Sequence, residues 1–195
     1  MSSQEIPLFP LGTVLFPEGP LPLRIFEARY VDMVSRCTRE NLTFGVALSV
    51  SSAEEEGVAR LAETGTSARI VDWNQGSDGL LYIMARGERR FRIRAVRQQD
   101  DGLHLAQVEW LAEETPYAPE QQLQAMAAAL HTLLKTSGVL YEDIEKQYAN
   151  ATWVGFRLAE ILPLAPATRQ RCLELHAARE RLDLLQPVAM QVIAR

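Results

Sequence analysis

The sequence has few cysteines and histidines, and this scarcity excludes several kinds of site. Only two cysteines occur in 195 residues, Cys37 and Cys172, so the chain has neither a disulfide framework nor the spacing of a cysteine zinc site. The three histidines, His104, His131 and His176, are scattered, and no pair has the spacing of metal ligands. We therefore expect no metal and no cofactor, and we expect both cysteines to be buried as small hydrophobic side chains.

Long apolar runs and an excess of basic residues are also absent. No window approaches the roughly eighteen apolar residues of a membrane-spanning helix, and the N-terminal residues lack the pattern of a signal peptide. The formal net charge of -5 argues against a dedicated nucleic-acid binder, which needs clustered Lys and Arg to displace counterions from phosphates. We expect a cytoplasmic protein that does not enter membranes.

Two sets of catalytic motifs are missing as well. The chain contains no GxxxxGK[ST] loop that would cradle the phosphates of ATP. Its only lysines, Lys135 and Lys146, lie outside any motif of a Ser–Lys nucleophile, so Lys135 with Ser137 is interpreted as the end of a helix. The acidic residues at 142–145 are interpreted as the opening of a helix, where carboxylates favour the dipole. The sequence therefore predicts a protein that is not an enzyme.

The first half of the chain has the pattern of strands with one helix. Segments 6–11 and 20–26 read as short edge strands because their prolines lack an N–H, and 12–19 reads as the connecting loop. From Phe26 the apolar positions follow the spacing of one helical face: Tyr30, Met33, Val34 and Cys37. Further strand patterns lie at 42–50, 66–74, 80–87, 89–98 and 103–111, with an acidic surface loop at 51–65. Consecutive strands joined by short turns pair antiparallel, and so many in a small domain commonly close into a barrel.

The second half has the period of helices, and we place the domain boundary between residues 116 and 117. Residues 1–116 are predicted to form the barrel and residues 117–195 a helical bundle. The expected elements are a helix from Glu120, a turn at 136–138, a short helical pattern through 144–148, and a helix capped by Thr152 and ended by Pro163. One last helix follows, which Pro187 kinks or stops.

Four segments carry a resemblance to a known family. They are IPLFPLGTVLFPEGPLPLRIFEARY at 6–30, FGVAL at 44–48, GTSARIVD at 65–72 and ARGERRFRI at 85–93. In this order and spacing they resemble the N-terminal, substrate-recognition domain of Lon proteases, a family also found as stand-alone bacterial proteins and inside cereblon. The resemblance covers nearly the whole chain, with the helical half matched only loosely. It implies an α+β fold, a PUA-like antiparallel pseudo-barrel with one inserted helix, followed by a C-terminal helical bundle.

The resemblance also implies a function, namely a non-catalytic module that binds other proteins and recognises unfolded or extended polypeptide. It leaves open whether a separate ATPase or protease works with the chain. Three aromatic side chains outside regular apolar patterns are candidate peptide contacts: Phe16 in the first loop, Trp73 at the end of a strand, and Tyr117 in the linker. For Phe16 and Trp73, packing in the core is the more common role of such side chains.

A basic strand supports an alternative function. Alternation along 89–98 would project three arginines from one face, Arg90, Arg92 and Arg94. The residues between them would then face the core: Phe91, Ile93 and Ala95. Because PUA-like barrels include RNA binders, RNA binding through this face is the alternative to protein binding. Neighbouring carboxylates such as Glu88 and Glu109 favour a salt-bridged face instead.

Overall fold

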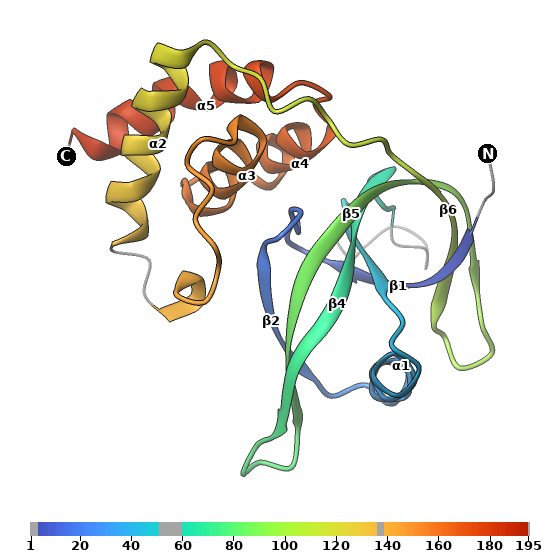
Figure 1. Ribbon diagram of the computed structural model, residues 1–195. Helices are drawn as coiled ribbons and strands as arrows, with labels where there is room; N and C mark the ends of the chain where they lie inside the picture. Colours follow the sequence, from blue (N-terminus) through green and yellow to red (C-terminus); the bar gives the residue numbers. More distant parts are fainter. Residues whose placement is uncertain (1–3, 51–59, 136–138, 195) are drawn as a thin grey trace. The chain divides into compact units, whose positions relative to one another are not determined.

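The computed structural model describes residues 4–50, 60–135 and 139–194 and has mixed α and β structure, as predicted (Figure 1). The chain divides into two compact units, Met1–Leu111 and Ala112–Arg195, slightly before the predicted boundary. Most of the expected acidic loop, residues 51–59, and the expected turn at 136–138 lie outside the described residues.

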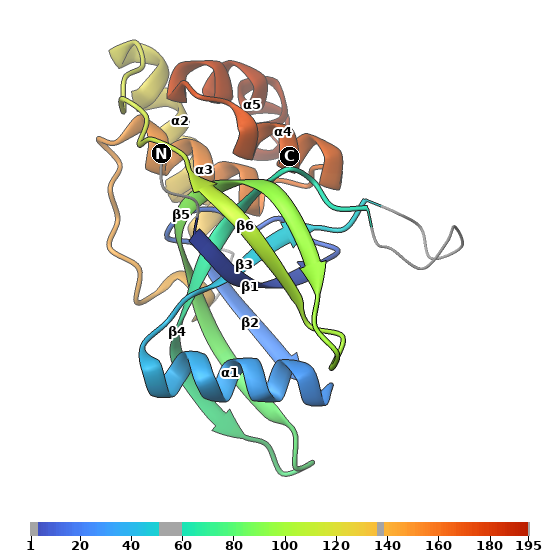
Figure 2. The same cartoon turned by 90° about the vertical axis from the view of Figure 1, so that its right-hand side faces the viewer.

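The first unit is a six-stranded sheet that closes on itself. Its elements are β1 (Gln4–Leu11), β2 (Pro20–Ile25), α1 (Ala28–Glu40), β3 (Phe44–Leu48), β4 (Thr64–Gln75), β5 (Leu81–Gln98) and β6 (His104–Trp110). The strand order is β2-β5-β4-β3-β1-β6, and an additional pairing of β5 with β6 completes a ring of five strands, with β2 added along β5 (Figures 1 and 2). The predicted barrel-like arrangement is therefore confirmed.

One pair departs from the predicted antiparallel pattern, because β1 pairs with β3 in parallel, in the register Leu8↔Gly45 to Leu11↔Leu48. The chain reaches β3 only after passing through β2 and α1, and this long connection returns it in the direction of β1. The remaining pairs of the sheet are antiparallel.

The long strand β5 replaces two strands that were expected at 80–87 and 89–98. It runs for 18 residues without a turn, since Gly87 lies within the sheet instead of ending a strand. The loop before β2 docks here: Glu18 N–H donates to Gly87 O over 2.7 Å, and Gly87 N–H donates to Gly19 O over 2.9 Å. A Cβ at residue 87 would lie 2.1 Å from Phe16 O, so only glycine allows this close approach.

Helix α1 covers the core of the first unit. Its buried residues are those predicted from the helical spacing: Tyr30, Met33, Val34 and Cys37. The ring of Tyr30 stacks on Phe9 of β1 with 3.9 Å between ring centroids. The helix ends at Asn41, whose left-handed backbone (φ 53°) lets Leu42 N–H bond to Cys37 O.

The second unit is helical, as predicted, but its boundaries differ in three places. It contains α2 (Glu120–Leu134), a 3-10 helix (Val139–Tyr141), α3 (Ala151–Ile161), α4 (Pro166–Glu174) and α5 (Ala178–Ile193). The expected helical pattern through 144–148 is irregular chain. The cap of α3 is Asn150, whose side chain accepts a bond from Trp153 N–H, and not Thr152.

The third difference is that the expected last helix is two helices, α4 and α5, and Pro187 lies inside α5. The break is stabilised by Arg181, which donates to the carbonyls of Cys172 and Leu175 at the end of α4. Within the described ranges, no helix has both the length and the apolar character needed to cross a membrane.

Candidate functional site

The three predicted aromatic residues lie in different environments. Phe16 has no exposed surface, so its side chain does not present the peptide contact we predicted. Its loop is held down on the sheet, where Thr66 Oγ1 donates to Leu15 O over 2.6 Å. Trp73 is 57% exposed on β4, and Tyr117 is 64% exposed in the segment before α2. Trp73 is therefore the exposed aromatic candidate within the first unit.

Trp73 belongs to a hairpin formed by the ends of β4 and β5, which extends past α1 (Figures 1 and 2). The edge strand β2 joins this hairpin and creates three cross-strand rows: Pro22–Met84–Asp72, Leu23–Ile83–Trp73 and Arg24–Tyr82–Asn74. Ile83 is buried in the core. Because side chains alternate along a strand, the first and third rows project from the opposite, outer face. Trp73 belongs to the second row and therefore lies on the same face of the hairpin as Ile83, but it stays exposed.

A shallow hollow of about 390 Å³ lies among these rows, bordered by residues 22–24, 72–74 and 82–84. Its apolar side chains include Pro22, Tyr82 and Met84. A second hollow of about 340 Å³ lies towards the turn and is bordered by Asn74, Gly76, Ser77, Asp78 and Tyr82. The hollows share Asn74 and Tyr82, and we call them together the hairpin groove.

The polar end of the hairpin groove is ordered by Asp78. This carboxylate accepts a hydrogen bond from the Tyr82 hydroxyl over 2.8 Å and another from Leu80 N–H over 3.1 Å. These bonds, that of Leu80 first, hold the pKa of Asp78 below its usual value, and the hydrogen bond to Asp78 raises the pKa of Tyr82. The groove therefore has an apolar end near Met84 and an anionic, hydrogen-bonding end at Asp78.

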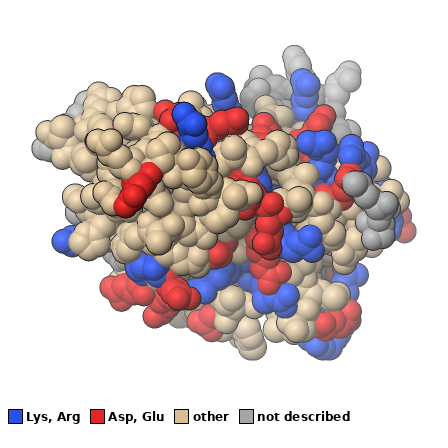
Figure 3. Space-filling model, turned by 45° about the horizontal axis from the view of Figure 1, so that its top comes forward, with Lys and Arg blue, Asp and Glu red and all other residues tan. Residues whose placement is uncertain are grey.

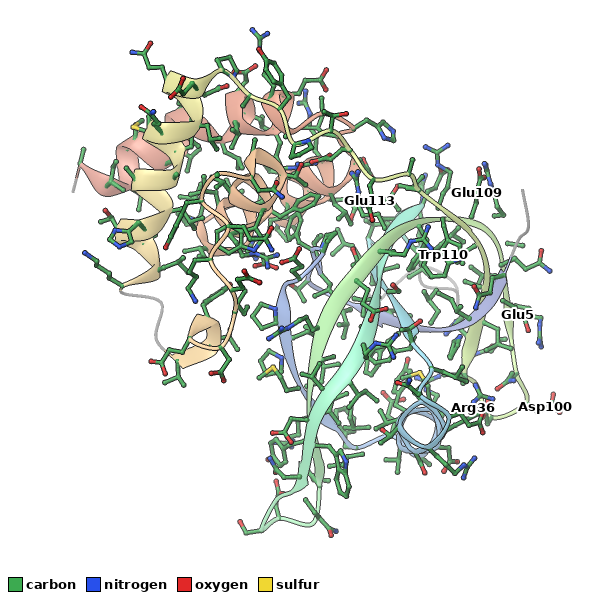
Figure 4. All side chains as sticks on the ribbon, viewed as in Figure 1. Glu5, Arg36, Asp100, Glu109, Trp110 and Glu113 are labelled. Atoms are coloured by element: carbon green, nitrogen blue, oxygen red, sulfur yellow. The ribbon has the colours of Figure 1, made fainter. Side chains whose placement is uncertain are left out.

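The arginine face of the alternative function is not a uniform basic surface. Arg90 is only 6% exposed, Arg92 is half-buried and Arg94 is exposed. Arg94 forms an ion pair with Glu109 on β6, with 2.8 Å from Nε to Oε2, and this contact lowers the pKa of Glu109. Farther along β5, Arg97 is similarly paired with Glu5 of β1 (Glu5 and Glu109 are labelled in Figure 4).

The alternation predicted for this strand also fails beyond Ile93. The register of β5 against β6 shifts between Ile93 and Ala95, so Ala95 is exposed and does not face the core. On the face shown in Figure 3, basic and acidic side chains are interspersed. The ion pairs of Arg94 with Glu109 and of Arg97 with Glu5 favour the salt-bridged interpretation of the arginine strand.

Other reactive side chains form no site in the described parts of the chain. Cys37 and Cys172 are buried, as predicted, and burial raises the pKa of both thiols. His104 is half-buried, and desolvation followed by the charge of Arg29 lowers its pKa. Residues 4–50, 60–135 and 139–194 contain no group of three or more His, Cys, Asp or Glu side chains that could hold a metal ion.

The first unit is thus a closed ring of strands with a projecting hairpin, and the second unit is helical. The model of the ATP-dependent protease La (LON) substrate-binding domain matches residues 5–188. The chain therefore belongs to the family of LON substrate-binding domains, and the resemblance seen in the sequence is confirmed.

Similar proteins and structures agree with this assignment. The crystal structure of a Lon N-terminal domain protein from Xanthomonas campestris is 35% identical, with a TM-score of 0.78 over 94% of this chain and 98% of that one. Cereblon from Xenopus tropicalis is 31% identical over 70% of this chain and 30% of its own length. Lon protease 2 from Herpetosiphon aurantiacus is 28% identical over 97% of this chain and 24% of its own length. The chain thus spans about a quarter to a third of these curated relatives.

Proposed function

We propose that the protein is a non-catalytic binding module that recognises unfolded or extended segments of other proteins through the exposed hairpin of β4 and β5, with Trp73 on one face and the hairpin groove on the other. The observation that carries the proposal is the exposure of Trp73, 57%, on a hairpin that also carries a hollow with apolar side chains. A large aromatic side chain left in water gains free energy when a partner covers it, and Trp is enriched among residues that dominate binding.

The groove favours recognition by side chains over strand addition. β2 ends the sheet order, so its outer edge has no strand partner there. Two of its six residues, Pro20 and Pro22, lack a backbone N–H. A peptide strand added at this edge would lose donors, whereas an apolar side chain placed over Pro22, Tyr82 and Met84 would be desolvated. Affinity is then expected to depend on apolar contact.

The family supports protein binding, and the rest of the function is our inference. The matched family is described as the substrate-binding domain of an ATP-dependent protease, and the match covers only that domain. The proposed function does not include proteolysis, because the sequence has neither an ATP-binding loop nor a Ser–Lys motif. We also propose that the protein acts in the cytoplasm.

The test is a titration of purified protein with a permanently unfolded model protein, read by fluorescence anisotropy at two salt concentrations. Trp73→Ala is expected to weaken binding by about 1 to 3 kcal/mol, which is roughly 5- to 150-fold. Val96→Ala removes an exposed apolar side chain from the far part of β5 and serves as the matched control. Raising the salt concentration should change the affinity little, since burial of apolar surface dominates.

Two further variants separate the other candidates. Tyr117→Ala tests the exposed tyrosine of the linker on its own. The double variant Arg92→Gln with Arg94→Gln should leave the affinity for the unfolded protein unchanged. Tight binding of a structured RNA that falls steeply with salt and is lost only in the arginine variant would replace our proposal with the RNA-binding alternative.

A further inference from the structure

The two ends of the hairpin groove differ chemically, and this difference bears on the kind of segment the groove accepts. The end near the body of the sheet has the apolar side chains of Pro22 and Met84. The end near the turn has Asn74, Ser77 and the carboxylate of Asp78. Tyr82 borders both hollows, and its hydroxyl donates to Asp78. An occupant that fills both ends therefore needs an apolar group and a polar group at a fixed separation.

The charges around the groove set the sign of that polar group. Its charged side chains are Asp72, Asp78 and Arg24, so one negative charge is in excess. Arg24 is the weakest of the influences that lower the pKa of Asp78, and it also opposes the rise in the pKa of Tyr82. The Asp78 carboxylate accepts two hydrogen bonds, which leaves acceptor capacity on both oxygens. A cationic donor complements this end.

The strand geometry gives the separation between the apolar end and the anionic end of the hairpin groove. Met84 and Tyr82 lie two residues apart on β5, which corresponds to about 7 Å along an extended strand, and Asp78 is bonded to the far end of the Tyr82 ring. A peptide that lies along the hairpin covers this distance with roughly two to four residues. The long side chains of lysine and arginine can reach a carboxylate from neighbouring backbone positions.

We infer that the hairpin groove selects extended segments in which an apolar side chain is accompanied, two to four residues away, by a lysine or an arginine. This inference rests on the proposed function and adds a substrate class to it. The apolar residue covers Met84 and Pro22, and the cation bonds to Asp78. Segments with an acidic residue at the second position are disfavoured, because the excess charge of the groove is negative.

The experiment uses three peptides of equal length that share one leucine and differ three residues away, where they carry lysine, alanine or glutamate. The full chain is titrated with each labelled peptide at low and moderate salt. The lysine peptide should bind about three- to tenfold more tightly than the glutamate peptide, with alanine between them, and the preference should shrink at higher salt.

Two variants with a matched control locate the effect. Asp78→Asn should abolish the preference for lysine, whereas Asp100→Asn, the same change in the exposed β5–β6 turn (Figure 4), should retain it. Arg24→Gln removes the opposing cation and should enlarge the preference. This second variant keeps the test decisive if Asp78→Asn disturbs the turn, because its expected change has the opposite direction.

The outcomes separate this inference from the proposed function. Equal affinity for all three peptides, with unfolded protein still bound and weakened by Trp73→Ala, overturns the charge selection alone. The charge selection is also overturned if Arg24→Gln leaves the preference for the lysine peptide unchanged. Failure of the wild-type protein to bind both the peptides and the unfolded protein rejects the inference together with the function on which it rests.

Discussion

Two arginines of the helical unit, Arg157 and Arg181, have no exposed surface, which is unusual for a charged residue. Arg181 makes a bidentate ion pair with Glu114, with distances of 2.5 and 2.9 Å, and also bonds to Cys172 O. Its guanidinium carbon lies 3.9 Å from the centre of the Phe156 ring. The residue therefore fixes the segment after the barrel to the helices.

Replacing Arg181 should be costly because it leaves the Glu114 carboxylate buried without its cation. We expect Arg181→Met to lower the free energy of unfolding by about 3 to 5 kcal/mol, measured by urea denaturation. The exposed neighbour Arg179→Met is the control and should change it by less than about 1 kcal/mol. Adding Glu114→Gln to Arg181→Met should restore part of the loss, and a double variant no more stable than the single one would contradict this account.

Glu160 gives the helical unit a dependence on pH. Burial raises its pKa to about 7, against the opposing charge of Arg157. The folded state therefore binds more protons than the unfolded state between about pH 4.5 and about pH 7, and stability should fall as pH rises through this window and then level off. The decrease should be on the order of 3 kcal/mol.

The neutral variant Glu160→Gln should remove this part of the pH dependence, since glutamine does not titrate. Urea denaturation at several pH values measures the slope in both proteins. Glu142→Gln, a change at an exposed carboxylate of the same unit, should keep the wild-type slope. If the free energy of unfolding changed with pH in the same way in wild type and Glu160→Gln, Glu160 would not titrate as expected.

Among the elements, β5 can hold the loop before β2 only because residue 87 is a glycine. Gly87→Ala places a Cβ against the carbonyl oxygen of Phe16 and should displace the loop that bonds to Gly87 on both sides. We expect a loss of about 2 kcal/mol or more in the free energy of unfolding, together with faster proteolysis in segment 12–19. Gly12→Ala, with nothing within 4 Å of the added Cβ, is the control. Equal stability of the two variants would mean that the loop relaxes without strain.

The same strand shows what local sequence patterns can predict. The period of apolar residues correctly predicted the buried face of α1, because that face depends on neighbours within the helix. It divided β5 at Gly87, since a glycine that ends a strand and one that admits another backbone have the same local sequence. The prediction that Thr152 caps α3 was wrong for a similar reason, because Asn150 and Thr152 are both suitable N-cap residues.

The candidate site could be predicted only in part. Trp73 could be predicted as a candidate for exposure, because this residue lies between a strand pattern and a polar turn. Tyr82, Met84 and Pro22 were missed because they come together only through the pairing of β2, β4 and β5. The arginine ladder was predicted from strict alternation, which the register shift after Ile93 interrupts. Pairing and irregularities in register depend on the whole sheet and leave little trace in a short window.

At the scale of the whole molecule, we expect purified protein to hydrolyse neither ATP nor peptides. The family match covers a substrate-binding domain alone, and both catalytic motif sets are absent from the sequence. A coupled assay for phosphate release and a fluorescent casein assay measure the two activities, with a complete Lon protease as the positive control. Turnover that disappears on mutation of a residue of this chain would contradict the expectation.

The ring of strands has a consequence for how the protein is made. β1 begins the described chain, yet one of its two neighbours is β6, in the register Gln4↔Val108. Once β1 has left the ribosome, about a hundred further residues must therefore follow before its second edge is covered. Contacts between such distant positions form slowly. During synthesis the apolar residues of β1 are thus exposed for most of the time that the barrel takes to appear, and a nascent chain stalled before β6 would itself present an uncovered strand to chaperones and proteases.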